Sequence, residues 1–178
     1  MKRKTSAGRA GKPKANIYYL ALAVAALGAL LVFGWWVRVP DKGPQLRAYF
    51  FKDEKLAAVE RRPDPDLPPL RQAIAELLAG PSERERGAGF TTMIPAGVRI
   101  LRVKTDGAVA IVDLSRELEE YGGGSAKVEG MIAQLVYTAT GLPGIDKAWI
   151  WVEGQRSVVL GGEGLVLDRP LGRQDVKD

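Results

Sequence analysis

The 178-residue chain contains neither cysteine nor histidine. The absence of cysteine excludes disulfide bonds, a CxxC redox site and a thiolate metal site. The absence of histidine excludes the Ser-His-Asp and Cys-His catalytic systems in their usual form, and also the common imidazole zinc sites. These absences exclude many familiar classes of enzyme. The length of the chain predicts one modest domain with an appendage.

Acidic residues are missing from the first 40 positions. Residues 1–16 carry six Lys or Arg, whereas residues 38–178 hold 20 basic and 21 acidic side chains, a balance of −1. The net charge of +5 therefore reports a basic tail and not a basic folded domain. A nucleic-acid-binding domain needs clustered basic residues on its folded surface, so we expect no nucleic-acid partner.

Residues 17–37 form a run of 21 residues without a charge. As a helix this run would extend about 32 Å, enough to cross a hydrocarbon core of about 30 Å. Aromatic pairs near both ends suit the headgroup regions, and the basic residues before the run predict a cytoplasmic N-terminus. We therefore predict a basic cytoplasmic tail at 1–16 and a transmembrane signal anchor at 17–37, which contacts the lipid bilayer and leaves residues 38 onward outside the cytoplasm.

A cleaved signal peptide is the alternative interpretation of this run. Its apolar core usually spans about 7–15 residues and ends at a small-residue cleavage site. The run found here is longer, ends in the bulky residues 35–37, and has no cysteine for a lipid anchor, all of which favour retention. Within it, Ala21, Ala25 and Ala29 recur at every fourth position, a small-residue spacing that could mediate homo-oligomerisation.

The sequence beyond the run divides into three parts. Residues 38–44 contain Pro and Gly and no apolar period, so they read as a short tether. Residues 45–172 carry the folded domain, and residues 173–178 are expected to fray. The domain's elements follow the order β-β-α-β-β-α-β-β, which predicts an α+β fold of one sheet with two helices against one face.

Two helices are predicted from apolar residues at helical spacing. In the first helix these residues are Leu70, Ile74, Leu77 and Leu78. The second is expected to begin at an N-cap Ser125 and to run to residue 139. Residues 82–97 read as a long polar loop between the first helix and the next strand. Its apolar members are expected to fold back onto the core: Phe90, Met93 and Ile94.

Three antiparallel hairpins are predicted. Their strands span 45–51 and 55–61, 98–104 and 108–113, and 147–152 and 157–161. The second hairpin turns at Asp106-Gly107, a pair that tolerates positive φ angles, and a change in apolar alternation near Ile100 predicts a bulge. The third is expected to turn at Gly154, and residues 165–171 are expected to lie on the domain.

A cluster of carboxylates is the first of four candidate sites: Asp113, Glu117, Glu119 and Glu120. It could hold an acid/base pair or a cation. However, it lacks the D-x-D-x-D-G order of a calcium loop, and spacing along a loop does not place two carboxylates across a cleft. We interpret the cluster as a solvated acidic turn.

Three further groups also receive structural interpretations. The glycine-rich residues 122–125 could receive an anion but lack the lysine of a phosphate loop, so they read as a flexible connection. Trp149 and Trp151 could form an exposed platform, although the area that a tryptophan buries favours the core. Threonines without a neighbouring base are expected to bond the backbone; they are Thr91, Thr92, Thr138 and Thr140. We assign no catalytic, cofactor-binding or metal-binding residue and predict that the chain is not an enzyme.

Five short motifs make the chain resemble the GerMN domain of sporulation and spore germination proteins, over about residues 45–172. They are LLAGP at 77–81, IPAG at 94–97, VDLS at 112–115, YTAT at 137–140 and VEG at 152–154. The resemblance implies an extracytoplasmic domain, anchored by a membrane segment or a lipid, without established enzymatic activity. It also implies a fold similar to the ring-building modules of envelope assemblies, and hence contacts with other proteins. This chain departs from the tandem spore protein in having one copy of the domain and no lipid-anchor cysteine.

Three functions are compatible with these observations. The first is an interaction module anchored in the membrane, serving sporulation, germination or a related envelope complex and contacting envelope or membrane proteins. The second is a module that binds the peptidoglycan of the cell wall or assists wall-remodelling enzymes. The third is a wall-cleaving enzyme that would use Asp113 and the nearby glutamates.

Overall fold

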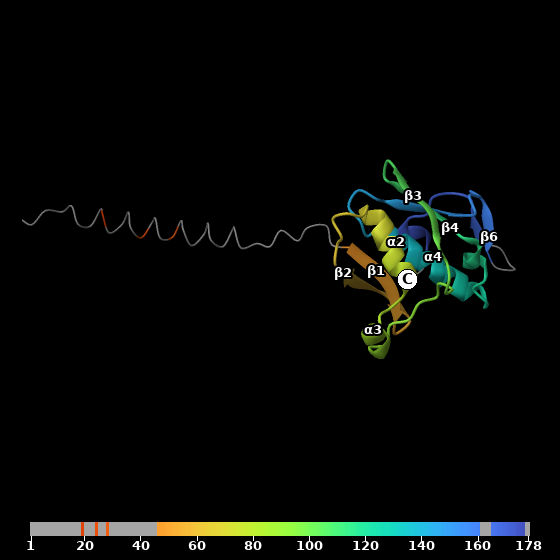
Figure 1. The fold of residues 1–178 in the computed structure, drawn as a ribbon, viewed down its shortest axis with the longest axis horizontal. Coiled ribbons are helices and arrows are strands. Elements are labelled where there is room, and N and C mark those ends of the chain that lie inside the picture. The colour runs from red at the N-terminus through yellow and green to blue at the C-terminus, as the bar shows by residue number, and fades with distance from the viewer. Residues whose placement is uncertain (1–18, 20–23, 25–27, 29–45, 161–164, 177–178) are drawn as a thin grey trace, which may run out of the picture. The chain divides into compact units, whose positions relative to one another are not determined.

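The folded domain lies in the second of two compact units, Gly43–Asp178 (Figure 1). The computed structural model describes residues 46–160 and 165–176, together with Tyr19, Val24 and Gly28. The domain is a mixed α+β fold, which confirms the predicted class. Its elements are β1 (Leu46–Lys52), β2 (Lys55–Arg61), α2 (Pro69–Ala79), α3 (Glu83–Gly87), β3 (Ile100–Asp106), β4 (Val109–Leu114), the 3-10 helix η1 (Arg116–Glu119), α4 (Ser125–Ala139), β5 (Lys147–Val152), β6 (Val158–Leu160), β7 (Leu165–Leu167) and the 3-10 helix η2 (Arg173–Asp175).

The predicted anchor at 17–37 lies outside the described residues except at three positions, each of which is helical. Across 46–160 and 165–176, no helix is both long and apolar enough to pass through a bilayer. The basic tail at 1–16 and the tether at 38–44 also fall outside the described part of the chain. All three segments stay predictions from the sequence.

The strands form three sheets, so the prediction of a single sheet is wrong. β1 and β2 form an antiparallel ribbon, β3, β4 and β5 form a three-stranded sheet in that order, and β6 pairs with β7. β5 runs parallel to β4, because α4 carries the chain back before β5 begins. The predicted hairpin at Gly154 is also wrong: after the turn only Val152 and Gln155 bridge, and β6 takes β7 as its partner.

The helix α4 is the central element of the domain. It contacts β1 of the ribbon, α2, and β5 of the three-stranded sheet. Most of its residues are buried for this reason, including Met131, Ile132 and Leu135, each with 0% of its surface exposed. The two helices pack against each other, and each contacts both the β1–β2 ribbon and the three-stranded sheet, so the predicted arrangement of two helices on one face of a single sheet is corrected.

Hairpin signals in the sequence predict the first two pairs of strands correctly. Asp53 and Glu54 turn β1 into β2 with φ angles of 51° and 64°, and β1 pairs with β2 in register from end to end. Asp106 pairs with Val109 across the turn of the second hairpin. The ladder of that hairpin shifts between Ile100 and Arg102, which confirms the predicted bulge.

The helix ends agree with the sequence in α2 but not in α4. α2 starts at Pro69, where a missing N–H costs nothing, and ends at Gly80 with φ of 79°. α4 starts one residue earlier than predicted. Gly124, and not Ser125, is its N-cap, Ser125 is the first helical residue, and no side-chain hydrogen bond caps this end.

The predicted polar loop at 82–97 contains a short helix, α3. Ser82 and Glu85 form a reciprocal capping box in which each side chain accepts a hydrogen bond from the backbone N–H of the other. The fold-back predicted for the rest of the loop is confirmed. Ile94 is buried, and Phe90 and Met93 pack partly buried against the core.

Candidate functional site

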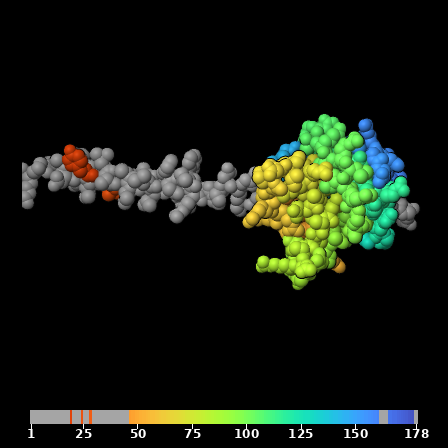
Figure 2. Space-filling model, viewed as in Figure 1, coloured from red at the N-terminus to blue at the C-terminus, as the bar shows by residue number. Residues whose placement is uncertain are grey.

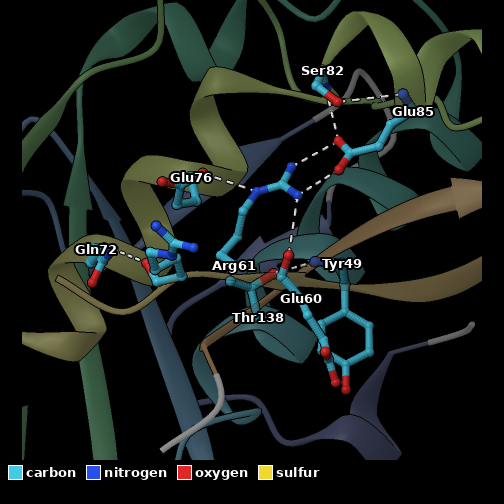
Figure 3. Close-up of polar contacts among 9 residues, drawn as sticks. Tyr49, Glu60, Arg61, Gln72, Glu76, Ser82, Glu85 and Thr138 are labelled. Atoms are coloured by element: carbon cyan, nitrogen blue, oxygen red, sulfur yellow. Dashed lines mark hydrogen bonds and ion pairs between the residues drawn. The ribbon is translucent and has the colours of Figure 1, made fainter.

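An arginine clamp connects three elements of the domain (Figure 3). Arg61 at the end of β2 contacts Glu85 of α3, with Nη1 to Oε1 at 2.6 Å and Nη2 to Oε2 at 2.9 Å. Its Nε lies 2.9 Å from Oε2 of Glu76 in α2. The hydrogen bonds from Arg61 hold the pKa of Glu85 down at about 2, and the same pairing raises the pKa of Arg61. The positive charge of Arg61 is compensated by the carboxylates of Glu85 and Glu76, so the clamp is structural.

Asp113 holds a turn and does not face a cleft. Its side chain is 3% exposed, and its Oδ1 accepts a 2.8 Å hydrogen bond from the backbone N–H of Gly154. The turn needs such support because Glu153 has a positive φ of 51°, which is unfavourable for a residue other than glycine. The Glu153 carboxylate in turn accepts from the N–H of Arg116 at 3.0 Å. Asp113 therefore joins the VDLS motif to the VEG motif.

The glutamates of the same candidate cluster have separate surroundings. Glu117 pairs with Arg99 at 3.1 Å, and its pKa is lowered chiefly by a hydrogen bond from the Ser115 side chain. Glu119 and Glu120 are exposed to solvent at the end of η1. In the portion of the chain that the structure describes, no cluster of three or more acidic side chains is arranged to hold a metal ion.

Three of the four threonines, Thr92, Thr138 and Thr140, bond the backbone with their side chains, as predicted. Thr138 Oγ1 accepts from the N–H of Tyr49 at 3.0 Å, and Thr92 Oγ1 donates to Gln134 Oε1 at 3.3 Å. Gln134, which the sequence analysis missed, is fully buried and also donates to the Tyr49 carbonyl at 2.9 Å. Its Oε1 accepts a further bond from the N–H of Met93 at 2.8 Å. This amide ties β1 and the IPAG loop to α4.

The C-terminal segment is held by Arg173 as far as the structure describes it, to residue 176. Arg173 Nε donates to Thr140 Oγ1 at 2.9 Å. Its guanidinium lies over the rings of Tyr137 and Tyr49, at 4.8 and 5.4 Å from their centroids. Hydrogen bonds from Gly172, and then from Arg169, lower the pKa of Asp175 at the end of η2. The expectation of a frayed tail from residue 173 is thus corrected.

The tryptophan pair is mostly core. Trp151 is 5% exposed and is covered by the guanidinium of Arg156, 4.9 Å from its ring. Trp149 is half-buried, meets Trp151 edge to face at 5.5 Å, and donates its indole N–H to the Arg156 carbonyl at 3.2 Å. The structure brings the pair beside Asp113, which is the register partner of Trp151. Only Trp149 presents part of a ring to solvent.

The glycine-rich connection is closed by a lysine of the following helix. Gly122 and Gly123 have positive φ angles of 45° and 141°, and Lys127 Nζ donates to the Gly122 carbonyl at 3.0 Å. The ammonium group of Lys127 is therefore engaged with the backbone of the loop, which agrees with the interpretation as a connection.

An open cavity of about 540 Å³ is a feature that the sequence analysis did not find. It lies where the start of α2, the tip of the β3–β4 hairpin and the turn between α4 and β5 meet. Its apolar walls come from Pro68, Pro69, Leu70, Val103, Leu142, Pro143 and Ile145. Two cations, Arg71 and Lys104, line it as well. Three segments distant in sequence build this site, and no local pattern could reveal it.

A second cavity, of about 420 Å³, brings together two of the recognised motifs. The LLAGP and IPAG motifs supply much of its lining, with Phe90 and Arg86 between them. Arg86 donates to the carbonyl of Pro81 and so closes one side. The structure thus places the two motifs side by side at one cavity.

The family model described as "Germane: Sporulation and spore germination" matches residues 47–158. The chain belongs to the Germane family. Its domain spans all of the motifs described above, and the strands and helices of the Germane match are β1 through β5 with the start of β6. No curated protein sequence matches the chain.

Three solved structures resemble this Germane domain. A candidate lipoprotein from Clostridium perfringens is 28% identical, with a TM-score of 0.55 over 75% of this chain and 91% of that one. The first GerMN domain of the sporulation protein GerM from Bacillus subtilis is 21% identical, with a TM-score of 0.61 over 74% of this chain and 98% of that one. The tandem GerMN domains of the same protein are 19% identical, with a TM-score of 0.59, and there the match covers 74% of this chain but 45% of that one. The GerM likenesses show the fold.

Proposed function

We propose that the chain is a single-pass membrane protein whose Germane domain lies outside the cytoplasm and binds other proteins of the envelope. It would act in sporulation, spore germination or a related envelope complex. The uncharged run at 17–37, preceded by six basic residues, supports the anchor. The likeness to a candidate lipoprotein supports a domain held at a membrane surface. The family supports the connection with sporulation.

One observation carries the interaction role: the buried side chains considered above as candidates for chemistry are engaged inside the domain, whereas a mostly apolar cavity stays open. Asp113 holds Gly154, Thr138 holds Tyr49, and Glu117 pairs with Arg99. A hydrolase would need a free acid or nucleophile in a cleft. These contacts support a module that binds without turnover.

The cell-wall alternatives receive less support from the geometry. A glycan platform built on both tryptophans would need two exposed rings, and Trp151 is 5% exposed under Arg156. A wall-cleaving enzyme would need Asp113 accessible, and it is 3% exposed. We therefore place protein binding ahead of wall binding and wall cleavage.

Photocrosslinking in the cell tests the proposal. A photoreactive amino acid is placed singly at exposed positions spread over the domain: Glu54, Thr105 and Val159. We expect at least one position to form adducts with membrane or envelope proteins, identified by mass spectrometry. Adducts should be lost in a chain without residues 17–37. Absence of protein adducts at all three positions, with saturable retention on purified peptidoglycan, would replace protein binding with wall binding.

A further inference from the structure

We propose that the 540 Å³ cavity defined above binds a segment of a partner protein in which a carboxylate lies beside an aliphatic side chain. This inference rests on the proposed function, because it names the site and the chemistry of the binding partner. It follows from three properties of the cavity: its size and walls, its unpaired cations, and the N-terminal start of α2 that borders it.

The size and walls of the cavity suit an aliphatic group. Binding sites for small groups usually measure about 300–1,000 Å³ and have mostly apolar linings with a few polar groups. Here the apolar lining is contributed by the first residues of α2, by Val103, and by the Leu142–Ile145 turn. Three of the lining residues are prolines, which restrict the backbone. The wall is thus largely preformed, which lowers the entropic cost of binding.

The two cations at the cavity call for an acidic ligand. Arg71 and Lys104 are exposed, and neither makes an ion pair with a described residue. Among the described residues that line the cavity none is acidic, although Asp106 follows closely after Lys104 in the hairpin. By contrast, Arg61 is compensated by two carboxylates. A carboxylate at the cavity would have two cationic partners from different elements, α2 and β3.

The start of α2 adds to the positive electrostatic potential that Arg71 and Lys104 create at the cavity. The first turn of α2 contains no acidic residue and has no side-chain cap, whereas α3 begins with a capping box and two glutamates. The free N–H groups at a helix start carry partial positive charge, and in α2 they come from Leu70 and Arg71 because Pro69 has no N–H. Pro69, Leu70 and Arg71 of this first turn all line the cavity. In Figure 2 the yellow surface of α2 adjoins the green surface of the β3–β4 hairpin, and both are open to solvent.

Selection from a random peptide library displayed on phage tests the inference. The full chain is held in nanodiscs of zwitterionic lipid, and phage that bind empty nanodiscs are removed first. We expect the enriched peptides to carry Asp or Glu beside Leu, Ile or Val. Their synthetic versions should bind about tenfold more weakly to the double variant Arg71→Gln/Lys104→Gln, since two ion pairs are lost at an exposed rim. Rising salt should weaken binding to the unmodified chain as well.

Two further variants separate charge from shape. Lys55→Gln/Arg84→Gln removes the same charge from exposed side chains that do not line the cavity, and it should change affinity by less than about twofold. Thr105→Trp keeps the charge but places a large ring on the exposed hairpin beside the cavity. It should weaken peptide binding about as much as loss of both cations, because the ring competes for the same space.

Three results would overturn the inference: no peptide enriched over empty nanodiscs, enriched peptides without an acid, or affinities that the Arg71/Lys104 variant leaves unchanged. Displacement of the selected peptides by purified wall muropeptides, with the same dependence on both cations, would instead identify the wall as the source of the carboxylate and overturn a protein partner. If crosslinks in the cell persist while the selection fails, the interaction role stands and only this site falls. If both fail, the proposed function falls too.

Discussion

The carboxylate of Glu85 lies with both oxygens on the guanidinium of Arg61, at 2.6 and 2.9 Å. Around this pair the domain joins β2, α2 and α3, so a short helix built almost entirely of charged residues stays in place. The side chains of Arg61 and Glu85 are 14% and 19% exposed, which places the pair at the edge of the core. Its contribution to stability should therefore be measurable and dependent on pH.

The first prediction concerns that dependence. Arg61 lowers the pKa of Glu85 from an ordinary 4.5 to about 2, so the ionised form is favoured in the folded state. The stabilisation of the folded state by the Arg61–Glu85 pair is fully present above pH 4.5 and is lost as the pH falls toward 2. At pH 7, Glu85→Gln should lower the free energy of unfolding by about 1–2 kcal/mol, after allowance for solvent screening. Urea unfolding in neutral micelles, followed by circular dichroism, measures it.

The matched control is Glu83→Gln, on the same turn of α3 but exposed. It should change the free energy of unfolding by less than about 0.5 kcal/mol. The gap between the two variants should close as the pH approaches 2. A gap of constant size from pH 7 to pH 2 would show that the Arg61 contact does not stabilise through the charge of Glu85.

The second prediction concerns the buried amide of Gln134. Gln134→Leu keeps the approximate size of the side chain but leaves the Tyr49 carbonyl and the Met93 N–H without their partner. Because these groups are inside the domain, we expect a loss of about 2–4 kcal/mol in the free energy of unfolding. Gln155→Leu, on an exposed turn, serves as control and should stay within about 0.5 kcal/mol. Equal losses in the two variants would contradict the assigned role.

The third prediction separates a structural from a catalytic Asp113. Asp113→Asn keeps an oxygen that can accept from the Gly154 N–H, so it should cost less than about 1 kcal/mol. Asp113→Ala removes the acceptor and should cost about 1–2 kcal/mol, with faster hydrogen exchange at Gly154. A general acid or base would lose activity alike in both variants, since neither Asn nor Ala can transfer the proton. Wall-hydrolysing activity in the parent chain that is abolished in Asp113→Asn would refute the structural role.

The fourth prediction concerns topology, and the lack of native cysteine gives it a clean background. In intact cells, a membrane-impermeant maleimide should label Glu54→Cys on the exposed β1–β2 turn. It should label Lys4→Cys only after the cells are opened, because the basic tail is expected in the cytoplasm. The reverse pattern, or a mature chain that begins after Trp36, would contradict a signal anchor.

The sequence allowed the local parts of this fold to be predicted. A two-residue turn such as Asp106-Gly107, or an apolar stripe such as that of α2, depends on neighbours along the chain and can be read without a structure. The missed helix α3 was also readable: Ser82 followed three residues later by Glu85 is a capping-box pattern. No apolar period runs through the segment, so periodicity alone does not indicate a helix there.

Partner choice among the strands could not be predicted in the same way. Whether β5 turns back onto β6 or lies parallel to β4 depends on where α4 returns the chain, and hydropathy along β5 fits either outcome. The roles of Asp113 and Gln134 depend on residues far away in sequence. The candidate cavity is of the same kind, since its walls come from three separated segments.

The outer strand β3 has a consequence for how copies of the domain coexist. In the described part of the chain, β3 hydrogen-bonds to β4 alone, and its exposed side chains include Arg102, Lys104 and Asp106. A neighbouring strand that tried to extend the sheet there would have to strip water from those charges. Many copies of the domain can thus crowd together without fusing edge to edge into insoluble ribbons.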